Sequence, residues 1–368
     1  MTRLRIQTSN FDIRTSNFDI RTSKMSLLSP IAALYGAAVR LRGWSYTAGV
    51  LPTARLRSSV ISVGNLTMGG TGKTPTTIAL GKLLLDSGHR VAILSRGYKG
   101  EHGGGPLLVS DGQRIHSTAN EAGDEALVIA RNLPRALVAV ARKRAEAGVW
   151  LEKRFGVDIH LLDDGFQHLQ LYRDLNLLVV DVTNPFGGGL LPQGRLREPL
   201  DAICRADAVI LSRTEVGHSY DELIDEVRRY KPGIPCLLAR QKLVSLRKLG
   251  EEEELPLESL SGLGVIAFAG IANPAQFLTT LGQAGIRVTQ SFSFPDHHHY
   301  RAQDYQRLVR ECDKLNVTAL ITTEKDAEKL SAAEFGPREV FTAKVAFEFD
   351  DLHRLSKLLS DVAGVAAR

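Results

Sequence analysis

The sequence predicts an α/β protein built on a parallel sheet, and three observations support this. Short apolar runs rich in β-branched residues alternate with helical patterns along residues 58–230, as buried strands and their crossover helices do. One of these strands leads through a glycine-rich loop into a helix, and another ends in two adjacent acids. Strands and helices continue after a Pro-Gly-Ile-Pro boundary at 232–235. We therefore expect a core domain at 58–230 and a smaller C-terminal α/β domain at 231–368.

Composition and charge narrow the classes of protein that fit. The chain is 43% hydrophobic and 24% charged, as folded soluble proteins are, which excludes wholesale disorder. Its three cysteines form no CxxC pair and indicate neither a disulfide framework nor a zinc site, which fits a reducing cytoplasm. The net charge of +5 permits anionic partners. No basic patch with interleaved aromatic residues indicates nucleic acid, and no obligate protein partner is evident.

Residues 1–24 contain a repeat that we do not expect to fold. The heptapeptide TSNFDIR occurs at 8–14 and again at 15–21. Two copies are too few for a coiled coil, and Ser, Asn and Asp are poor helix formers. We expect a disordered extension outside the fold, with Met25 as an alternative start.

A helical segment without acids precedes the core, at residues 25–57. Ser29 and Pro30 have the order of an N-cap and a first-turn proline, and apolar residues then recur at helical spacing. The apolar stretch is too short to span a bilayer, but it suits a helix lying on an anionic membrane surface. The alternative is a helix packed on the domain core. The aromatic and basic residues that favour the membrane are Trp44, Tyr46, Arg40, Arg42, Arg55 and Arg57.

The stretch SSVISVGNLTMGGTGKTPTT, residues 58–77, combines the parts of a phosphate-binding P-loop. A strand at 60–63 enters a Gly- and Thr-rich loop, and Lys73 and Thr74 then open a helical stretch that stops at Gly88. Loop N–H groups and the helix N-terminus would surround phosphate oxygens. Lys73 would reach the β- and γ-phosphates, and the Thr74 hydroxyl would bind Mg²⁺. The other expected contacts to the nucleotide are Thr67, Gly69, Gly70, Thr71 and Gly72.

Thr67 departs from the usual P-loop pattern, which has glycine at that position. The cluster Gly69-Gly70-Thr71-Gly72 would supply the flexibility instead. The alternative is a Gly-rich turn between a strand and a helix with a chance Lys-Thr pair. The strand before the loop and the helix after it favour the P-loop. We therefore expect a P-loop NTPase core.

Two adjacent acids, Asp163 and Asp164, follow the strand at 157–162. An acid at the carboxyl end of a core parallel strand is the Walker B arrangement, which holds Mg²⁺ directly or through water. Two acids side by side repel each other unless a cation or hydrogen bonds offset the repulsion. The alternative is a solvated turn.

Three further stretches contain candidate site residues. Acids gather at the head of the helical pattern 120–133, where the helix dipole alone would also favour them. The loop 184–200 lies between the strands at 175–181 and 208–213, and its length, glycines and arginines suit a lid or an anion clamp, or else a plain surface loop. The pattern TALITTEKDAEKL, 318–330, predicts a strand, a turn and a helix with charges at its head.

The smaller domain has one more polar cluster, PDHHHY at 295–300. Neighbouring histidines on an extended loop rarely converge on one metal ion, and one of them as an acid–base or orienting partner fits equally well.

Seven motifs in this order resemble the tetraacyldisaccharide 4′-kinase (lipid A 4′-kinase) family: GNLTMGGTGKTP, LSRGY, GDE at 123–125, LLDDGFQH, GRLREPL, FPDHH and TTEKDAEKL. The resemblance extends over roughly residues 25 to 345. DDGFQH and the P-loop with Thr for Gly are specific to that family, so Thr67 supports the resemblance.

The resemblance implies transfer of the ATP γ-phosphate to the 4′-hydroxyl of a tetraacyl glucosamine disaccharide 1-phosphate, at the cytoplasmic face of the bacterial inner membrane. It also implies a membrane-associating N-terminal helix and an active site in the cleft between the two domains. Residue by residue, Asp124 matches the catalytic aspartate and His297 the histidine that pairs with it. Asp163 and Asp164 match the Mg²⁺-binding acids, and Arg197 and Glu198 match the polar pair beside the phosphates.

Two other kinds of protein would also contain a P-loop. One is a nucleotide-dependent switch at the membrane, although no NKxD-like guanine-binding motif follows the strand at 208–213, where SRTE stands instead. The other is a membrane-bound scaffold with an inactive P-loop, which the intact Lys73, Thr74, Asp163 and Asp164 disfavour.

Overall fold

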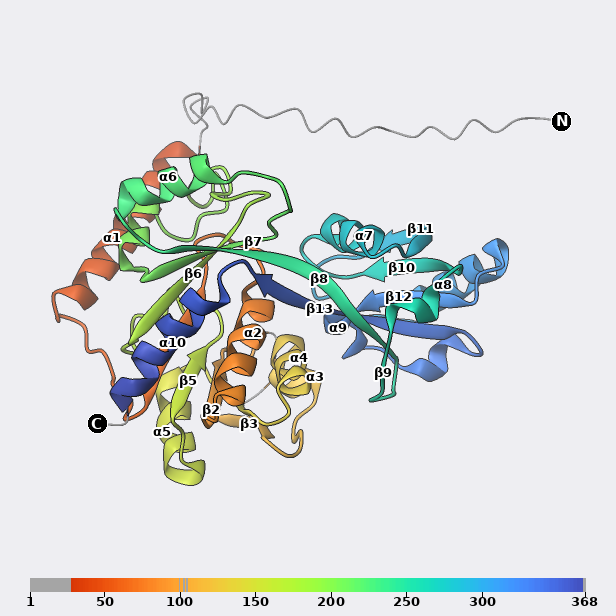
Figure 1. The fold of residues 1–368 in the computed structure, drawn as a ribbon, viewed down its shortest axis with the longest axis horizontal. Helices are drawn as coiled ribbons and strands as arrows, with labels where there is room; N and C mark the ends of the chain where they lie inside the picture. Colours follow the sequence, from red (N-terminus) through yellow and green to blue (C-terminus); the bar gives the residue numbers. More distant parts are fainter. Residues whose placement is uncertain (1–27, 99, 102, 104, 367–368) are drawn as a thin grey trace.

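The structure is a computed structural model that describes residues 28–98, 100, 101, 103 and 105–366. The predicted extension at 1–24 lies outside these residues. The described strands form one mixed, mostly parallel sheet of thirteen strands, which confirms the α/β prediction (Figure 1). Its strand order is β11-β10-β12-β13-β8-β7-β6-β1-β5-β2-β4-β3, with β9 paired to β8.

The N-terminal half of the sheet contains the predicted P-loop strand near its middle. Its strands are β1 (Ser59–Gly64), β2 (Val91–Ser95), β3 (Leu107–Asp111), β4 (Leu137–Val140), β5 (Ile159–Leu162), β6 (Leu175–Asp181) and β7 (Ala208–Ser212). All neighbours in this half pair in parallel except β3 and β4. The carboxyl ends of the parallel strands therefore lie along one edge of the sheet, where ligands bind in such folds.

Helices cover both faces of this half. They are α1 (Ser29–Thr47), α2 (Lys73–Asp86), α3 (Ala119–Ala122), α4 (Asp124–Asn132), α5 (Arg144–Phe155) and α6 (Asp221–Tyr230). The helix expected at 120–133 is thus two helices, because Gly123 interrupts it with φ +84°. None of the helices in the described residues is both long and apolar enough to cross a membrane.

The C-terminal half continues the same sheet. Its strands are β8 (Cys236–Lys248), β9 (Glu254–Leu255), β10 (Gly264–Ala269), β11 (Arg287–Ser293), β12 (Ala319–Thr323) and β13 (Glu339–Phe349). Its helices are α7 (Pro274–Gln283), α8 (Ala302–Leu315), α9 (Glu324–Ala327) and α10 (Leu352–Ala366). Strand β8 pairs first in parallel with β7 and then antiparallel with β13. The two long strands β8 and β13 join the halves (Figure 1).

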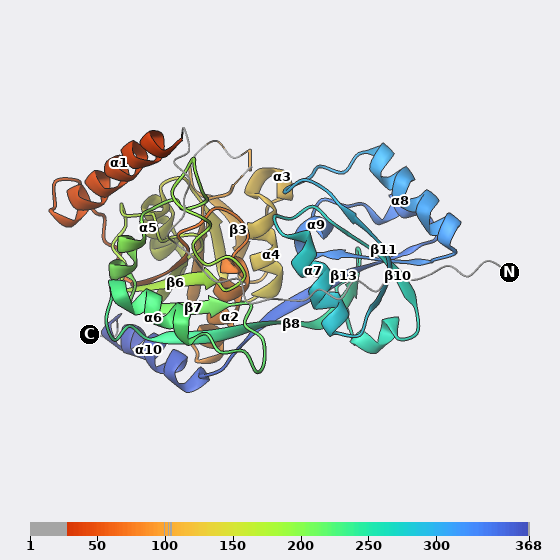
Figure 2. The ribbon, with the colours of Figure 1, turned by 90° about the horizontal axis from the view of Figure 1, so that it is seen from above.

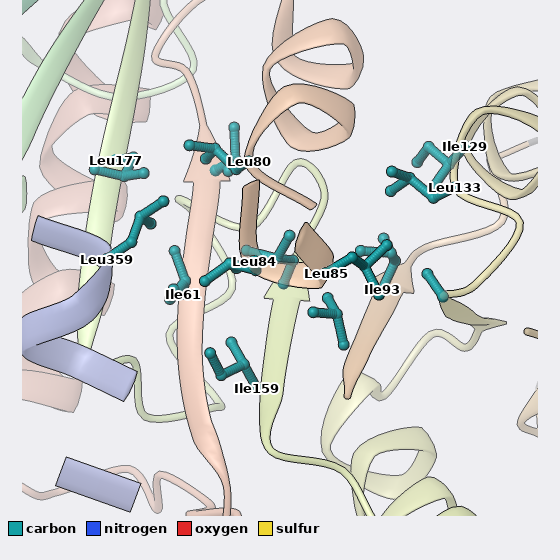
Figure 3. Close-up of a cluster of buried hydrophobic side chains, with 14 of the residues drawn as sticks. Ile61, Leu80, Leu84, Leu85, Ile93, Ile129, Leu133, Ile159, Leu177 and Leu359 are labelled. Atoms are coloured by element: carbon teal, nitrogen blue, oxygen red, sulfur yellow. The ribbon is translucent and has the colours of Figure 1, made fainter. Parts of the chain in front are cut away.

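The largest apolar core lies under α2 and α4. Side chains such as Ile61, Leu80, Ile93 and Ile159 are fully buried there, between the sheet and the helices (Figure 3). Leu359 of α10 belongs to the same core, so the C-terminal helix packs on the N-terminal half although its sequence follows the second. The domain boundary at residue 231 remains a prediction. Residues 352–362 follow that boundary in the sequence but pack on the N-terminal half.

Helix α1 lies on the outside of the N-terminal half (Figure 2). One face is docked: Ala32 and Gly36 are buried, and a Cβ on Gly36 would lie 2.8 Å from Leu190. The Tyr35 hydroxyl donates to the Arg197 carbonyl at 2.8 Å, and Arg40 pairs with Asp201 at 2.7 Å. The alternative of a helix packed on the core is thus correct for this face.

Candidate active site

Side-chain hydrogen bonds fix the conformation of the glycine-rich loop after β1. Gly69 and Gly72 have φ of +108° and +89°, which side chains other than glycine rarely adopt. The Asn65 amide donates to the Thr67 carbonyl at 2.8 Å and to the Thr71 hydroxyl at 2.7 Å. The Ser212 hydroxyl, at the end of β7, donates to the Thr71 carbonyl at 2.8 Å. Since α2 begins at Lys73, the free N–H groups of its first turn adjoin this loop.

Thr67 stands at the position where the P-loop pattern has glycine, and the structure gives a reason for the difference. Thr67 forms an antiparallel bridge with Leu196. The backbone N–H of Met68 donates to the Arg195 carbonyl, and that of Arg197 to the Leu66 carbonyl, each at 2.7 Å. Extended pairing needs no positive φ, so a β-branched residue is suitable here. The predicted clamp loop at 184–200 is therefore fixed directly to the P-loop.

Asp164 forms an ion cluster with Lys73 and Arg197. Arg197 donates to both carboxylate oxygens, at 2.9 and 3.0 Å, and Lys73 Nζ lies 3.8 Å from one of them. Burial opposes ionisation of this carboxyl, but the charges of Lys73 and Arg197 outweigh it and hold the pKa of Asp164 well below its usual value. Asp164 is therefore an anion that orients both cations beside the loop.

Asp163 directly follows β5 and is buried, and its side chain forms no ion pair within the described residues. The Thr77 hydroxyl donates to it at 3.0 Å. Burial, together with the charges of Glu125 and Asp164, raises the pKa of Asp163 to about 7. A carboxylate in this setting favours a nearby cation.

A second pair forms where the two halves meet. His297 Nδ1 lies 3.0 Å from the Asp124 carboxylate, and both side chains are buried. Asp124 is the first residue of α4, whereas His297 belongs to the loop after β11 and has φ +59°. Burial raises the pKa of Asp124, but the hydrogen bond from His297 and the charge of Lys325 outweigh it, so the net pKa lies below the usual value.

This second pair can act as a general base. A buried carboxylate whose orientation a histidine fixes can accept a proton from a hydroxyl group placed against it. The neighbouring His298 is engaged elsewhere, with Asp304 at 3.0 Å and the Phe294 ring at 4.8 Å. Of these two histidines, His297 is the one that contacts Asp124.

The remaining predicted residues lie around these groups. Thr74 follows Lys73 in the first turn of α2 and is partly buried. Glu198 is buried and accepts a hydrogen bond from Arg205, whose guanidinium lies 4.9 Å above the Phe166 ring. A role for Glu198 in binding metal remains a prediction that competes with this ion pair.

A cavity of about 310 Å³ lies beside the P-loop and extends to the C-terminal half. Arg213, on one side of it, donates to the Gly70 carbonyl at 2.6 Å and pairs with Asp181. The residues that line the cavity are Thr67, Met68, Gly69, Gly70, Thr71, Asp181, Thr183, Asn184, Gly187, Arg195, Arg213, Ala272 and Asn273. The volume and the adjoining loop suit a nucleotide.

Sequence reasoning missed Asn65, Arg213, Lys325 and Lys329 as parts of the site. Asn65 and Arg213 directly follow β1 and β7, so their position at carboxyl ends of parallel strands was an available signal. Lys325 stands in the TTEKD motif and contacts His297 at 3.0 Å, but charges at a helix head usually serve solvation.

Comparisons with known proteins agree on one family. The family model described as tetraacyldisaccharide-1-P 4′-kinase matches residues 24–363. The tetraacyldisaccharide 4′-kinase of Geobacter metallireducens is 41% identical over 83% of this chain and 88% of its own length. That of Desulfatibacillum aliphaticivorans is 38% identical over 91% of both chains.

A solved structure extends the likeness to the fold. The crystal structure of LpxK from Aquifex aeolicus in complex with ATP is 34% identical to this chain, with a TM-score of 0.73. It covers 91% of this chain, which in turn covers 98% of it. Together with the family model and the relatives, this shows that the chain belongs to the tetraacyldisaccharide-1-P 4′-kinase family.

Proposed function

We propose that this chain transfers the γ-phosphate of ATP to the 4′-hydroxyl of a tetraacyldisaccharide 1-phosphate. One observation supports the proposal above all: the phosphate-binding loop follows β1, and the buried Asp–His pair lies against Tyr98, which follows β2, while β5 pairs in parallel with both strands. Phosphoryl transfer needs positioned cations at the phosphates and a group that takes the proton of the acceptor hydroxyl. The two clusters supply these two requirements.

The phosphate end uses residues whose charges are already paired and oriented. Lys73 lies in the first turn of α2, and its Nζ is 3.4 Å from the Gly69 carbonyl and 3.8 Å from Asp164. Arg197 is fixed through its two bonds to Asp164 and lies on the loop paired with the P-loop. Both cations would stabilise charge that develops on the transferred phosphate.

Mg²⁺ fits the donors at the carboxyl end of β5. No group of three or more His, Cys, Asp or Glu side chains in the described part of the chain could hold a metal ion by itself. Mg²⁺ is commonly held by one or two carboxylates together with phosphate oxygens and water. Asp163 is the better candidate of the two acids, because Arg197 bonds to both oxygens of Asp164. With the Thr74 hydroxyl, Asp163 would hold the ion, which neutralises phosphate charge when bound.

At the acceptor end, Asp124 would take the proton of the sugar hydroxyl as that oxygen bonds to the γ-phosphorus and the bond from this phosphorus to the bridging oxygen breaks, which releases ADP. Its lowered pKa keeps it ionised near neutral pH. The contact with His297 holds the carboxylate in one orientation. Such acid–base contributions are worth about 10²- to 10⁴-fold in rate.

Helix α1 fits an acceptor that stays in a membrane. Its outward face exposes Leu34, Leu41 and Trp44, each more than 60% exposed, while its inner face contacts the backbone of Arg197. We propose that this face lies in the surface of the inner membrane, on the cytoplasmic side. The acyl chains of the substrate would then remain in the bilayer while the headgroup enters the site.

The experiment is transfer of labelled γ-phosphate from ATP to tetraacyldisaccharide 1-phosphate in detergent micelles, with and without Mg²⁺. Lys73→Ala is the control variant. We expect labelled lipid with the unmodified chain and Mg²⁺, and none with the variant. If ATP binds but no lipid is labelled under any condition, the proposed reaction is wrong and a nucleotide-dependent switch becomes the better account.

A further inference from the structure

Two lysines enclose the Asp124–His297 pair, Lys325 in the short helix α9 and Lys329 in the turn that follows it. Lys325 Nζ lies 3.0 Å from His297 Nε2, and Lys329 Nζ lies 3.6 Å from the Asp124 carboxylate. The proposed function uses neither lysine. Asp124 belongs to the N-terminal half and both lysines to the C-terminal half, so this cluster forms only when the halves meet.

We propose that Lys325 is a positioning residue that fixes His297 in the tautomer with hydrogen on Nδ1, and thereby keeps Asp124 as the proton acceptor. An ammonium group has three hydrogen-bond donors and no acceptor. The ring nitrogen that faces it at 3.0 Å must therefore offer a lone pair. The hydrogen of the neutral ring then lies on Nδ1, which donates to Asp124 at 3.0 Å.

Charges around Lys325 keep it protonated. Its Nζ lies 3.3 Å from both Glu125 and Asp296. Burial lowers the pKa of Lys325, but the charges of Glu125, Asp124 and Asp296 outweigh it and raise the net value. With a permanent cation against Nε2, a second proton on the ring would place two positive charges in contact. The ring therefore serves as a neutral donor.

The groups that face the pair come from four segments. Glu125 belongs to α4, Asp296 precedes His297 in its loop, and Tyr98 follows β2 with its ring 5.2 Å from the imidazole. Lys325 and Asp326 come from α9, and Lys329, in the turn after it, lies 3.3 Å from Asp326. Of these groups, Lys325 alone directs a hydrogen-bond donor at Nε2 in the described residues.

Lys325 could instead act only as a tie, that is, as an ion-pair link between the halves. It pairs with Glu125 of the N-terminal half and with Asp296 of the C-terminal half. The two roles have different consequences. A tie would affect stability and the assembly of the site, whatever residue stands at 297. A positioning role acts through His297 and loses its effect once that imidazole is gone.

The activity test is a double-mutant cycle with Lys325→Met and His297→Asn. The positioning role rests on the proposed function, and kinase activity measures it. We expect Lys325→Met alone to lower kcat by about tenfold or more, and to change it less than about threefold when His297 is already Asn. An equal loss in both backgrounds would refute the positioning role. Lys314→Met, the same change at an exposed site on α8, should leave kcat unchanged.

The pH profile gives a second readout, which reports the charge that Lys325 places near Asp124. The charge of Lys325 lowers the pKa of Asp124, so its removal raises that pKa. The acidic limb of kcat/KM should therefore move to higher pH in Lys325→Met, and Lys325→Arg, which keeps the charge, should restore it. An acidic limb that stays in place in Lys325→Met contradicts the proposal.

A measurement without catalysis separates this proposal from the proposed function. In protein labelled with ¹⁵N-histidine, the signal lost in His297→Asn identifies the ring. We expect hydrogen on Nδ1 and a bare Nε2 in the unmodified chain, and a mixture of tautomers in Lys325→Met. Hydrogen on Nε2 in the unmodified chain would overturn the proposal, whether or not any lipid is phosphorylated.

Discussion

At the scale of residues, the site depends on two carboxylates with opposite surroundings. Asp164 is bonded to Arg197 and lies near Lys73, so it is firmly anionic. Asp163 is buried next to other acids, and its pKa rises to about 7. Asp124 has a third setting, between a histidine and two lysines. Environment rather than residue type therefore separates the cation-orienting, metal-binding and base roles that we assign.

Replacing Asp124 with Asn tests the base directly. The amide keeps the shape of the side chain but cannot accept a proton at neutral pH. We expect kcat to fall by about 10²-fold or more, because acid–base groups contribute that much, while ATP affinity changes little. Steady-state kinetics and binding of a fluorescent ATP analogue measure the two effects.

The chain offers a matched control for this variant. Asp304 accepts from His298 at 3.0 Å, the same distance as in the Asp124–His297 pair, but it caps α8 instead. Asp304→Asn should leave kcat within a few-fold of the unmodified value. If Asp124→Asn also stays within a few-fold, Asp124 is not the base.

Most residues of the candidate site could be proposed from the sequence, because they stand in motifs with a known mechanism. The P-loop and the paired acids follow strands, and parallel strands bring their carboxyl ends to one edge. The contact of His297 with Asp124 could be expected only from the resemblance, since 173 positions separate the two residues. The roles of Asn65 and Arg213 depend on side-chain directions that spacing does not show.

At the scale of elements, the break between α3 and α4 sets the position of Asp124. Gly123 has φ +84°, and a Cβ there would lie 2.5 Å from the Tyr98 carbonyl. The sequence pattern at 120–133 is continuous and predicts one helix. The glycine ends the first helix, so that Asp124 becomes the first residue of the second and projects from its N-terminus.

We expect Gly123→Ala to lower both stability and kcat. A positive φ with a side chain costs on the order of 1–3 kcal/mol, and the overlap with Tyr98 must shift the start of α4 as well. Thermal melting and the kinase assay measure the two effects. Gly217→Ala is the control, because Gly217 has φ +81° with nothing within 4 Å of its Cβ position. That variant should lose some stability and no activity; equal behaviour of the two would show that the Tyr98 contact does not matter.

Glu152 of α5 joins this helix to the residue before β1, Ser58. Its carboxylate accepts from the Ser58 N–H and hydroxyl, both at 2.8 Å, and faces His160 at 3.5 Å. Burial raises the pKa of Glu152, but the interactions with His160 and Ser58 outweigh it and lower the pKa to about 2. A folded-state pKa below the unfolded value means that the stabilisation is complete above about pH 4.3 and is lost as pH falls toward 2.

Glu152→Gln should therefore lower Tm at pH 7, since hydrogen bonds to charged groups contribute about 1.5–3 kcal/mol. The difference from the unmodified protein should shrink between pH 4.5 and 3. Glu146→Gln, at an exposed position on the same helix, should change Tm little at either pH. A constant Tm difference across this range would mean that the ionised form of Glu152 is not what stabilises the contact.

At the scale of the whole molecule, the sheet was harder to predict than its elements. The sequence patterns indicate two successive α/β units, but β8 and β13 run from one half to the other, and α10 returns to the first core. Pairing between strands about 100 residues apart leaves no local periodicity to detect. The two halves are thus parts of one sheet, with nucleotide-sized space and the Asp–His pair between them.

The membrane contact that we propose for α1 would orient the whole molecule. Its docked face includes Tyr35, which bonds to the Arg197 backbone, so the helix is fixed relative to the site. Leu34 and Leu41 lie two turns apart on the opposite face, and Trp44 follows one turn later, so they form an apolar outward surface. If that surface enters the lipid headgroup layer, the site lies at a set height above the bilayer.

Replacing Leu34, Leu41 and Trp44 together with Ser should release the protein from vesicles of anionic lipid. The three side chains are 73%, 62% and 61% exposed, so the folded state loses little, and Tm should stay within a few degrees. Co-sedimentation measures the effect, and activity on a short-chain, micelle-free acceptor should persist. The control replaces Val216 and Val244, which are 76% and 47% exposed on other elements, with Ser. The α1 variant and the control both lose exposed apolar side chains. Loss of vesicle binding in the α1 variant alone would therefore assign the membrane contact to this helix. Undiminished binding of the α1 variant would show that the protein meets the membrane elsewhere.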